Sequence, residues 1–150
     1  MKTLCIIPCG SRKIWDKNPD AGPVEAKYVY TGRFSKKCRE YAEKFYPNDW
    51  CILSAKHGFL YPNDIIPEPY NVTFKIKRTR PISSNELSKQ IVDKSLDKYE
   101  KIVIIGGKDY VNIAKKCFPS KEVYTPLSGC KGNGEMESKL NGSLRTNISL

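Results

Sequence analysis

Three continuous apolar runs constrain the fold of this chain more than any other feature. Residues 3–8, 50–54 and 101–105 consist mainly of isoleucine, leucine, valine and cysteine, with few polar residues inside them. Such runs are typical of strands that are buried on both faces of a sheet. The stretches between the runs are long enough to hold helices. The chain therefore predicts alternating strands and helices, and a mostly parallel sheet with right-handed crossovers.

The segments between the runs carry helical signals. Over residues 31–46, apolar side chains recur at helical spacing with lysines and arginines elsewhere on the wheel, and Thr31 is the expected N-cap. Ser83 and Glu86 have the spacing of a capping box that opens a second helix. A third helix is expected after the last apolar run, and a short terminal helix over residues 135–141.

Two further segments complete the predicted sheet. Residues 122–126 read as a short fourth strand, and residues 71–78 alternate apolar and polar positions, as in an edge strand or an extended arm. We expect a single α/β domain over residues 1–142, with a four- to five-stranded, mostly parallel sheet between flanking helices in a three-layer, glycosylase-like arrangement. Residues 143–150 are expected to form a frayed tail.

The charge of the chain indicates its partners. The formal net charge is +10 over 150 residues. Such a surplus favours polyanionic partners, with nucleic acid first and an anionic membrane second, and a merely solubilising surface is the alternative. No run is long enough to span a bilayer, and the first residues lack a signal-peptide pattern. We therefore expect a cytoplasmic protein that binds DNA and does not enter a membrane.

The cysteines argue against a structural metal. The chain has six cysteines and one histidine, and no C-x-x-C pair occurs among them. Zinc ligands usually come in closely spaced pairs, so we expect neither a metal nor another cofactor. Most of the cysteines fall inside apolar periods and are expected to be reduced core residues.

The loop over residues 54–71 is the first candidate site. It follows a buried strand and contains three prolines, two acidic residues, two tyrosines and the only histidine. Proline restricts the backbone, so the loop should be rigid, and open α/β proteins keep their sites at the carboxyl ends of strands. The candidate residues in this loop are Lys56, His57, Asp64, Tyr70 and Asn71.

Further loops at strand ends should lie beside it. The turn after the first run contains Cys9, Gly10, Ser11 and Lys13, which can form an anion-binding nest. Gly106 and Gly107 precede a helix N-terminus, which is a second anion site without the ending of a P-loop. The loop after the fourth strand adds Ser128 and Lys131, and the arm adds Lys75, Lys77 and Arg78 as cations for a phosphate backbone, although lysines that guard an edge strand have the same pattern.

Four of these segments together resemble a known family. They are residues 8–13, the Ser-Ala-Lys-His-Gly-Phe-Leu sequence of 54–60 with its following prolines, residues 105–111, and residues 126–141. They resemble small uncharacterised bacterial, archaeal and phage domains related to the YaaA peroxide-stress proteins, and this resemblance implies a DNA-related role. The layout is more remotely similar to the uracil-DNA glycosylase superfamily, in which an acid or amide positions water. Residues 126–129 resemble the loop that presses on the DNA minor groove in that superfamily.

The first hypothesis is an N-glycosidase that removes a damaged or modified base from DNA. Asp64 would orient water, and His57 or Lys56 would neutralise charge on the departing base. Tyr70 would stack on the base, Asn71 would read its edge, and the glycine loops would hold phosphate. The alternatives for these residues are a turn cap for Asp64, a structural histidine for His57 and a core anchor for Tyr70.

Two other functions fit the same sequence. One is a non-catalytic DNA-binding protein, for which the net charge and the basic arm suffice. The other is an enzyme that transfers ribosyl groups of free nucleosides or nucleotides, with the loops binding one nucleotide. A cysteine nucleophile at Cys9 lacks an evident base.

Overall fold

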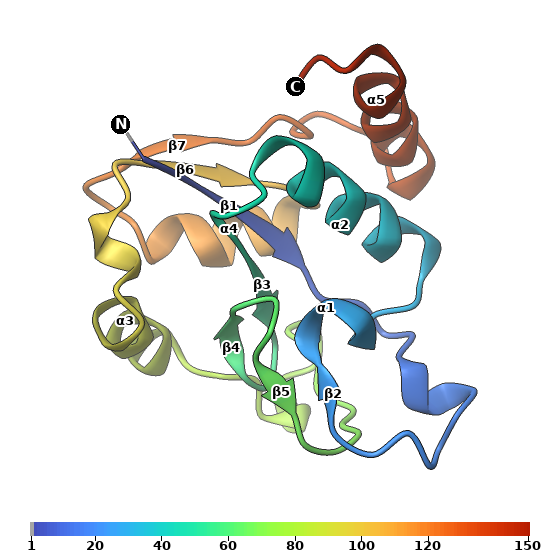
Figure 1. Ribbon diagram of the computed structural model, residues 1–150. Coiled ribbons are helices and arrows are strands. Elements are labelled where there is room, and N and C mark those ends of the chain that lie inside the picture. The colour runs from blue at the N-terminus through green and yellow to red at the C-terminus, as the bar shows by residue number, and fades with distance from the viewer. Residues whose placement is uncertain (1) are drawn as a thin grey trace.

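The computed structural model describes residues 2–150 and shows a five-stranded sheet covered by helices (Figure 1). The strands are β1 (Thr3–Pro8), β2 (Val24–Glu25), β3 (Trp50–Ser54), β4 (Gly58–Leu60), β5 (Ile65–Ile66), β6 (Lys101–Ile104) and β7 (Glu122–Tyr124). The α-helices are α1 (Ala26–Val29), α2 (Arg33–Phe45), α3 (Ser84–Asp93), α4 (Lys108–Lys116) and α5 (Asn133–Thr146). Three short 3-10 helices are η1 (Ile14–Asp16), η2 (Lys77–Thr79) and η3 (Leu96–Lys98).

The main sheet has the order β4-β3-β1-β6-β7. The strand β1 pairs in parallel with β3 and with β6, and β7 pairs in parallel with β6. Only β4 runs antiparallel, against β3. The prediction of a four- to five-stranded, mostly parallel α/β sheet is therefore confirmed.

The fifth strand is not the one that the sequence suggested. Residues 71–78 form no strand, so the edge-strand alternative is wrong. The segment is not fully extended either, because it turns at residues 74–75 and enters η2 at Lys77. The strand β4 lies instead within the segment that we predicted to be a loop. A tight turn after β3 reverses the chain, so that β4 runs antiparallel along β3. The short strand β5 of the same segment pairs with β2 in a second, two-stranded sheet.

Helices cover both faces of the sheet. Along β1, Cys5 and Ile7 pack in the cluster that includes residues of α2 and α5, whereas Leu4 and Ile6 pack in the cluster that includes residues of α3 and α4. Figure 1 shows these helix pairs on opposite sides of the strands. Burial of a large side chain such as Phe59, which is fully buried, contributes about 1.5–3 kcal/mol.

The helix ends confirm one predicted cap and correct two boundaries. Ser83 caps α3, because its side chain accepts a hydrogen bond from the N–H of Glu86. The cap of α2 is Gly32, so the assignment of Thr31 was wrong by one residue. The terminal helix is longer than the predicted 135–141, because α5 runs to Thr146 with Leu140 and Ser143 buried. Residues 143–146, which we expected to fray, belong to this helix, and the N–H of Leu150 donates to the hydroxyl of Tyr41 at 3.1 Å.

The order of the strands fixes the place of a site. The chain leaves β1 toward β3 on one side and later returns to β6 on the other side of β1. This reversal opens a crevice outside the carboxyl ends of β1 and β6, which is where open α/β sheets bind ligands. None of the helices in residues 2–150 is long and apolar enough to cross a membrane.

Candidate functional site: a cleft at the carboxyl ends of β1 and β6

A cleft of about 690 Å³ occupies this crevice. Its walls come from the turn after β1, the first turns of α2, α4 and α5, and the arm after β5. The lining residues are Pro8, Cys9, Gly10, Ser11, Arg12, Lys13, Gly32, Arg33, Phe34, Ser35, Asn71, Val72, Thr73, Phe74, Lys75, Gly107, Lys108, Asp109, Tyr110, Asn133, Met136 and Glu137.

Three of the helices that meet the cleft begin with a glycine cap. The N-caps of α2, α4 and α5 are Gly32, Gly107 and Gly132, and none of the three has a side-chain hydrogen bond at its cap. Their first-turn N–H groups therefore lack the acceptor that a serine or aspartate cap supplies. Each such helix end carries a partial positive charge, so together they make this cleft attractive to phosphate.

Cations line the same cleft. Arg12, Arg33, Lys75 and Lys108 are exposed there, whereas Lys13 is only 6% exposed. The ammonium of Lys13 donates to the carbonyl of Ser11 at 3.3 Å, and burial lowers the pKa of Lys13. Lys13 thus contributes a buried cation to the wall, and the four others contribute solvent-exposed ones.

Two aromatic side chains stand at one wall. The rings of Phe74 and Tyr110 meet edge to face, with centroids 5.7 Å apart. The hydroxyl of Tyr110 lies 2.7 Å from the sulfur of Cys9. Burial raises the pKa of the Cys9 thiol, so at neutral pH this cysteine is a protonated thiol rather than a nucleophilic thiolate. This wall therefore provides apolar surface that a ligand ring can contact, and it does not provide a nucleophile.

Two carboxylates line the cleft, and the sequence analysis identified neither. Glu137 lies in α5 with its side chain 15% exposed, and its carboxylate is 3.2 Å from Nε of Arg33 at the start of α2. Asp109 lies in the first turn of α4 and is exposed. The only signal for Asp109 in the sequence is its place in the first turn of a helix that follows a glycine turn, and Glu137, one turn further into α5, has no comparable signal.

Close backbone packing shapes the turn after β1. A Cβ atom added to Gly10 would lie 2.5 Å from the Oγ of Ser35 in α2, so only glycine fits without movement of that serine. Gly106, at the end of β6, has a φ of 146° that side-chain-bearing residues rarely adopt. Gly106 does not line the cleft but allows the turn that brings Gly107 to it.

The cleft gathers many of the predicted binding residues. Those that line it are Cys9, Gly10, Ser11, Lys13, Asn71, Lys75 and Gly107. Lys77 and Arg78 follow on the exposed η2 helix, beside the wall segment. Ser128 and Lys131 are exposed in the loop after β7 and do not line the cleft.

Tyr70 lies behind the cleft and anchors the wall segment that follows it. Its hydroxyl is 2.5 Å from the hydroxyl of Tyr30 and 2.9 Å from the Oγ of Ser54. The ammonium groups of Lys13 and Lys56 lie 4.6 and 5.7 Å from the centre of the Tyr70 ring. These contacts favour the alternative interpretation of Tyr70 as an anchor over a base-stacking role.

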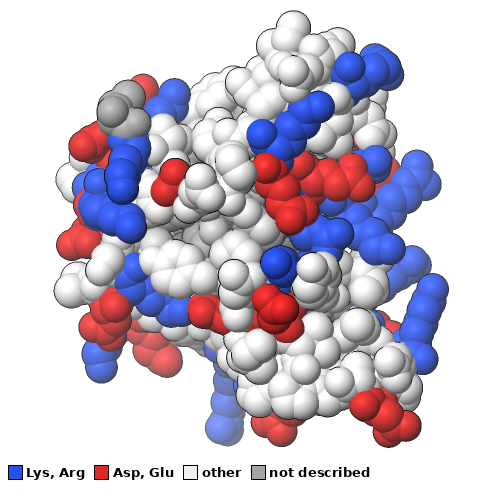
Figure 2. Space-filling view, viewed as in Figure 1, with Lys and Arg blue, Asp and Glu red and all other residues white. Residues whose placement is uncertain are grey.

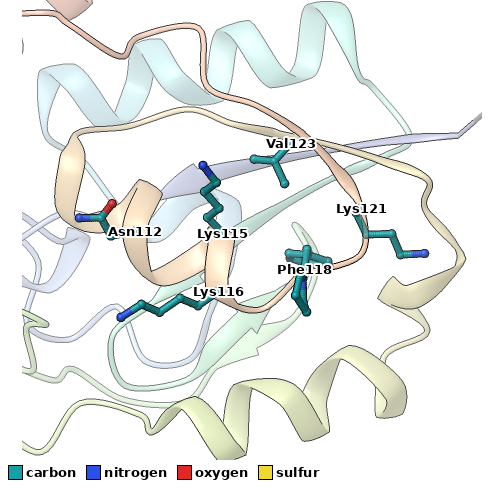
Figure 3. A pocket seen from close by; sticks show the side chains of 7 residues that line it. Asn112, Lys115, Lys116, Phe118, Lys121 and Val123 are labelled. Carbon is teal, nitrogen blue, oxygen red and sulfur yellow. The ribbon is translucent and has the colours of Figure 1, made fainter.

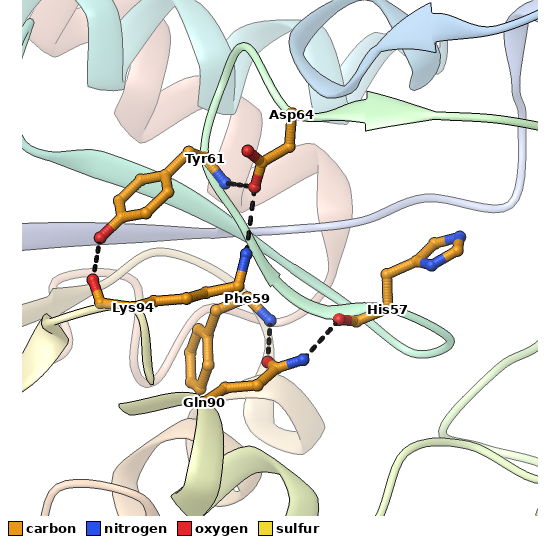
Figure 4. Close-up of polar contacts among 6 residues, drawn as sticks. All are labelled: His57, Phe59, Tyr61, Asp64, Gln90 and Lys94. Carbon is orange, nitrogen blue, oxygen red and sulfur yellow. Dashed lines mark hydrogen bonds and ion pairs between the residues drawn. The ribbon is translucent and has the colours of Figure 1, made fainter. Parts of the chain in front are cut away.

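The proposed catalytic group of the central loop is not assembled in the cleft. Asp64 accepts hydrogen bonds from the N–H of Tyr61 at 2.8 Å and from Nζ of Lys94 at 3.1 Å, and it does not line the cleft (Figure 4). The ring of His57 points away from Asp64 in Figure 4 and meets the ring of Tyr70 edge to face. Asp64 thus braces the loop against the end of α3, as the turn-cap interpretation anticipated.

Hydrogen bonds hold the backbone of His57 on both sides. Its backbone N–H donates to the Oγ of Ser54 at 3.0 Å, and its carbonyl accepts from Nε2 of Gln90 at 2.9 Å. Its ring Nε2 is buried and has no hydrogen-bond partner among residues 2–150. Burial lowers the pKa of His57, with the nearby charge of Lys56 adding to the effect. His57 and Lys56 do not line the cleft.

A second hollow lies at the other end of the sheet. Its volume is about 560 Å³, and it is lined by Phe118, Val123 and the lysines 115, 116 and 121 at the end of α4 and the start of β7 (Figure 3). Figure 2 shows further lysines and arginines around most of the outline of one face, with a concentration at its right-hand edge beside α2. Positive charge is therefore spread over the surface and is not confined to the cleft.

The comparisons with known proteins concern the whole length of the chain. Residues 4–141 match a family described as "Family of unknown function (DUF6884)". The chain belongs to this family. It is also similar to a Bacillus subtilis (strain 168) protein described as "Uncharacterized protein YfjM", with 43% identity over 142 residues that cover 94% of each chain. No solved structure matches the chain.

For this DUF6884 protein, the expectation of a small uncharacterised family is confirmed. Among residues 2–150, no group of three histidine, cysteine, aspartate or glutamate side chains is placed to hold a metal ion. The lining of the cleft supplies amides, cations, aromatic rings and two carboxylates.

Proposed function

We propose that the cleft binds one nucleotide unit of DNA and that the protein hydrolyses the bond between its base and its sugar. The observation that carries the proposal is the meeting of three glycine-capped helix N-termini with an aromatic wall and a half-buried carboxylate in one cleft. The helix ends suit phosphate, the rings suit a base, and the carboxylate suits a cationic sugar.

The phosphate would lie against the helix ends. Free N–H groups of α2, α4 and α5 would donate to its oxygens, and Arg12 and Lys108 would add mobile positive charge. Gly10 allows the backbone of the turn after β1 to lie close to the N-terminus of α2, where the phosphate would bind. The proposal of a phosphate cradle at Gly10, Ser11, Lys13 and Gly107 is thus retained, with Gly106 in a supporting role.

The base would lie against Phe74 and Tyr110. Both aromatic side chains line the cleft, and stacking of a base on one aromatic ring contributes about 1–3 kcal/mol. Asn71 and Asn133 also line the cleft, and amide groups can both donate to and accept from the edge of a base.

The carboxylate of Glu137 takes the role that we first assigned to Asp64. It would steady positive charge on the sugar and accept a proton from the attacking water. The water oxygen bonds to C1′ of the sugar, the C1′–N bond breaks, its electron pair leaves with the base, and the base takes up a proton. The Arg33 guanidinium lies 3.2 Å from this carboxylate and holds it at the wall of the cleft.

The resemblance to YaaA-related proteins and the remoter similarity to uracil-DNA glycosylases support DNA as the substrate. The net charge of +10 supports it as well. We place the protein in the cytoplasm, where it would meet DNA, and we propose no cofactor.

The test is base release from DNA. The protein is incubated with duplex and single-stranded DNA carrying normal, deaminated, oxidised, hydroxymethylated or glucosylated bases, and alkali-sensitive abasic sites are counted. We expect release by the wild type, loss of release with Glu137→Gln, and retained release with Asp64→Asn, which is the matched control outside the cleft. Absence of abasic sites on every substrate would overturn the proposed reaction.

A non-catalytic DNA-binding protein is the second candidate. Lys75, Lys77, Arg78 and Arg80 are exposed on one arm, and none of them forms an ion pair with a carboxylate of residues 2–150. Under this alternative, the protein retains DNA with a steep salt dependence and Glu137→Gln leaves binding unchanged. The same protein incubated with free nucleosides and nucleotides tests the ribosyl-transfer alternative, which predicts release of the base from these small molecules.

A further inference from the structure

The arm beside the cleft contains a compact loop over residues 73–79. The Oγ1 of Thr79 lies 2.6 Å from the carbonyl oxygen of Ile76 and 3.0 Å from that of Thr73, so its one proton is shared between these two acceptors, and it accepts from the N–H of Thr73 at 3.1 Å. The backbone closes the same loop, since the N–H of Thr79 donates to the carbonyl of Ile76 at 3.1 Å. One side chain thus ties both ends and the tip of this loop together.

Both ends of the arm are fixed to the body of the protein. Tyr70 precedes it and is hydrogen-bonded to Tyr30 and Ser54. Beyond the loop, the N–H of Ile82 donates to the carbonyl of Ala55 at 2.7 Å. The loop therefore has a preformed shape, and it does not need to order itself when a partner binds.

The loop presents two different surfaces. Phe74 turns into the cleft and meets Tyr110, whereas Ile76 is 42% exposed to solvent. Lys75, Lys77 and Arg78 surround this exposed isoleucine in the sequence and are themselves exposed. An apolar side chain at the tip of a rigid loop, with cations on both sides, has the chemistry of a wedge that enters a DNA duplex between two base pairs.

We propose that Ile76 inserts into a DNA duplex beside the nucleotide that the cleft receives. The three cations would hold the flanking phosphates, and Ile76 would fill the space that the departing base leaves in the stack. Unstacking costs a few kcal/mol per step, and a preformed wedge would offset part of that cost. This inference rests on the proposed function, because it requires the cleft to take a nucleotide of DNA.

The test uses duplexes of about 20 base pairs with one 2-aminopurine beside a normal pair, a mismatch or an abasic-site analogue. The fluorescence of 2-aminopurine rises when the base leaves the stack. We expect a rise with saturating wild-type protein, and a rise smaller by about threefold or more with saturating Ile76→Ala. Ile65→Ala is the matched control, because Ile65 is also exposed but lies on β5 and does not line the cleft.

The outcomes separate the wedge from the reaction. If Ile76→Ala gives the same fluorescence rise as the wild type, or if the wild type binds without any rise, the wedge is overturned while base release can still stand. If the rise depends on Ile76 but no abasic sites form, the wedge stands and the proposed hydrolysis fails. An unchanged melting temperature of Ile76→Ala shows that the variant is folded. A wild type that does not retain duplex DNA would overturn the wedge, whereas the proposed hydrolysis is overturned only by the absence of abasic sites on single-stranded DNA as well.

Discussion

The carboxylate of Asp64 lies 3.1 Å from Nζ of Lys94 at the end of α3. The same carboxylate accepts the N–H of Tyr61, and the ammonium of Lys94 also lies 5.4 Å from the centre of the Tyr61 ring. The most conspicuous acid of the central loop is thus part of a brace that joins the loop after β4 to α3. Its effects should appear in stability rather than in chemistry.

Replacing Asp64 by Asn should therefore lower stability and leave DNA chemistry unchanged. The partly exposed ion pair and the hydrogen bond to Tyr61 together contribute about 1–2 kcal/mol, which corresponds to a melting temperature lower by about 2–8 °C. The measurement is thermal unfolding of Asp64→Asn, with Asp93→Asn at the exposed end of α3 as the control. Equal melting temperatures for the two variants would contradict the role of the brace.

Replacing Gly10 by Ala should damage the phosphate side of the cleft. The added Cβ would lie 2.5 Å from the Oγ of Ser35, so the turn or the serine must move, at a cost of about 1–3 kcal/mol. We expect weaker binding of a phosphorylated oligonucleotide in a fluorescence anisotropy titration. A second change, Ser35→Ala, removes the clashing oxygen and should restore much of the binding.

The control for this substitution is Gly142→Ala in α5, away from the first turn of that helix. A Cβ atom added there meets no other atom within 4 Å, and alanine is favoured over glycine in a helix. Gly142→Ala should bind as the wild type does. If Gly10→Ala behaves like Gly142→Ala, the close approach of the first turn to α2 has no consequence for the site.

Stability should fall as the pH drops through the range in which histidine titrates. Burial lowers the pKa of His57 below its ordinary value of 6.5, so the unfolded chain binds a proton more readily than the folded one. The stabilisation is therefore fully present above about pH 6.5 and is lost as the pH falls toward the lower folded pKa. The charged groups near this ring are Lys56, which disfavours protonation, and Glu68, which favours it.

The measurement is urea unfolding between about pH 5 and pH 7.5 for the wild type and His57→Gln. Because the chain has one histidine, the difference between the two proteins in this range isolates His57. The variant should show a flatter dependence of stability on pH. Parallel curves for the two proteins would show that the unpartnered Nε2 does not influence folding.

The thiol of Cys9 should react slowly with alkylating reagents. Burial raises its pKa, and the hydrogen bond from Tyr110 lowers it in part. Iodoacetamide labelling, followed by mass spectrometry across a range of pH, should show Cys9 modified only at a higher pH than a free thiol requires. Tyr110→Phe removes the opposing hydrogen bond and should shift the onset of labelling to still higher pH. A downward shift would refute this account of the pair.

The layout of the fold was readable because its strands are buried on both faces. The runs that became β1, β3 and β6 contain almost no polar residue, and the parallel sheet follows from the helical spacing between them. The strand β4 was not predicted because it has only three residues and follows a tight turn over residues 55–57, with its first residue, Gly58, at a φ of 74°. A prediction from periodicity needs more residues than such a strand contains.

The location of the candidate site could be predicted from the sequence, whereas some of the residues that line it could not. The glycine turns after β1 and β6 meet because carboxyl ends of parallel strands share one edge of the sheet. The role of Asp64 depends on Lys94, thirty residues later, and no local pattern links the two. Glu137 reaches the cleft only because α5 packs beside α2, which is a tertiary contact that the sequence does not encode in any short motif.

The glycine caps of α2, α4 and α5 have a consequence for how the protein is held together. A helix that lacks a capping side chain begins with donors that only water satisfies, so part of its potential stability is left unrealised in the free protein. A bound phosphate would act as the shared cap of all three helices. Because phosphate would bind the folded protein and not the unfolded chain, occupancy of the cleft would stabilise the folded state. The melting temperature would then rise with the concentration of inorganic phosphate. The three helix N-termini would therefore be most stable when the ligand is bound.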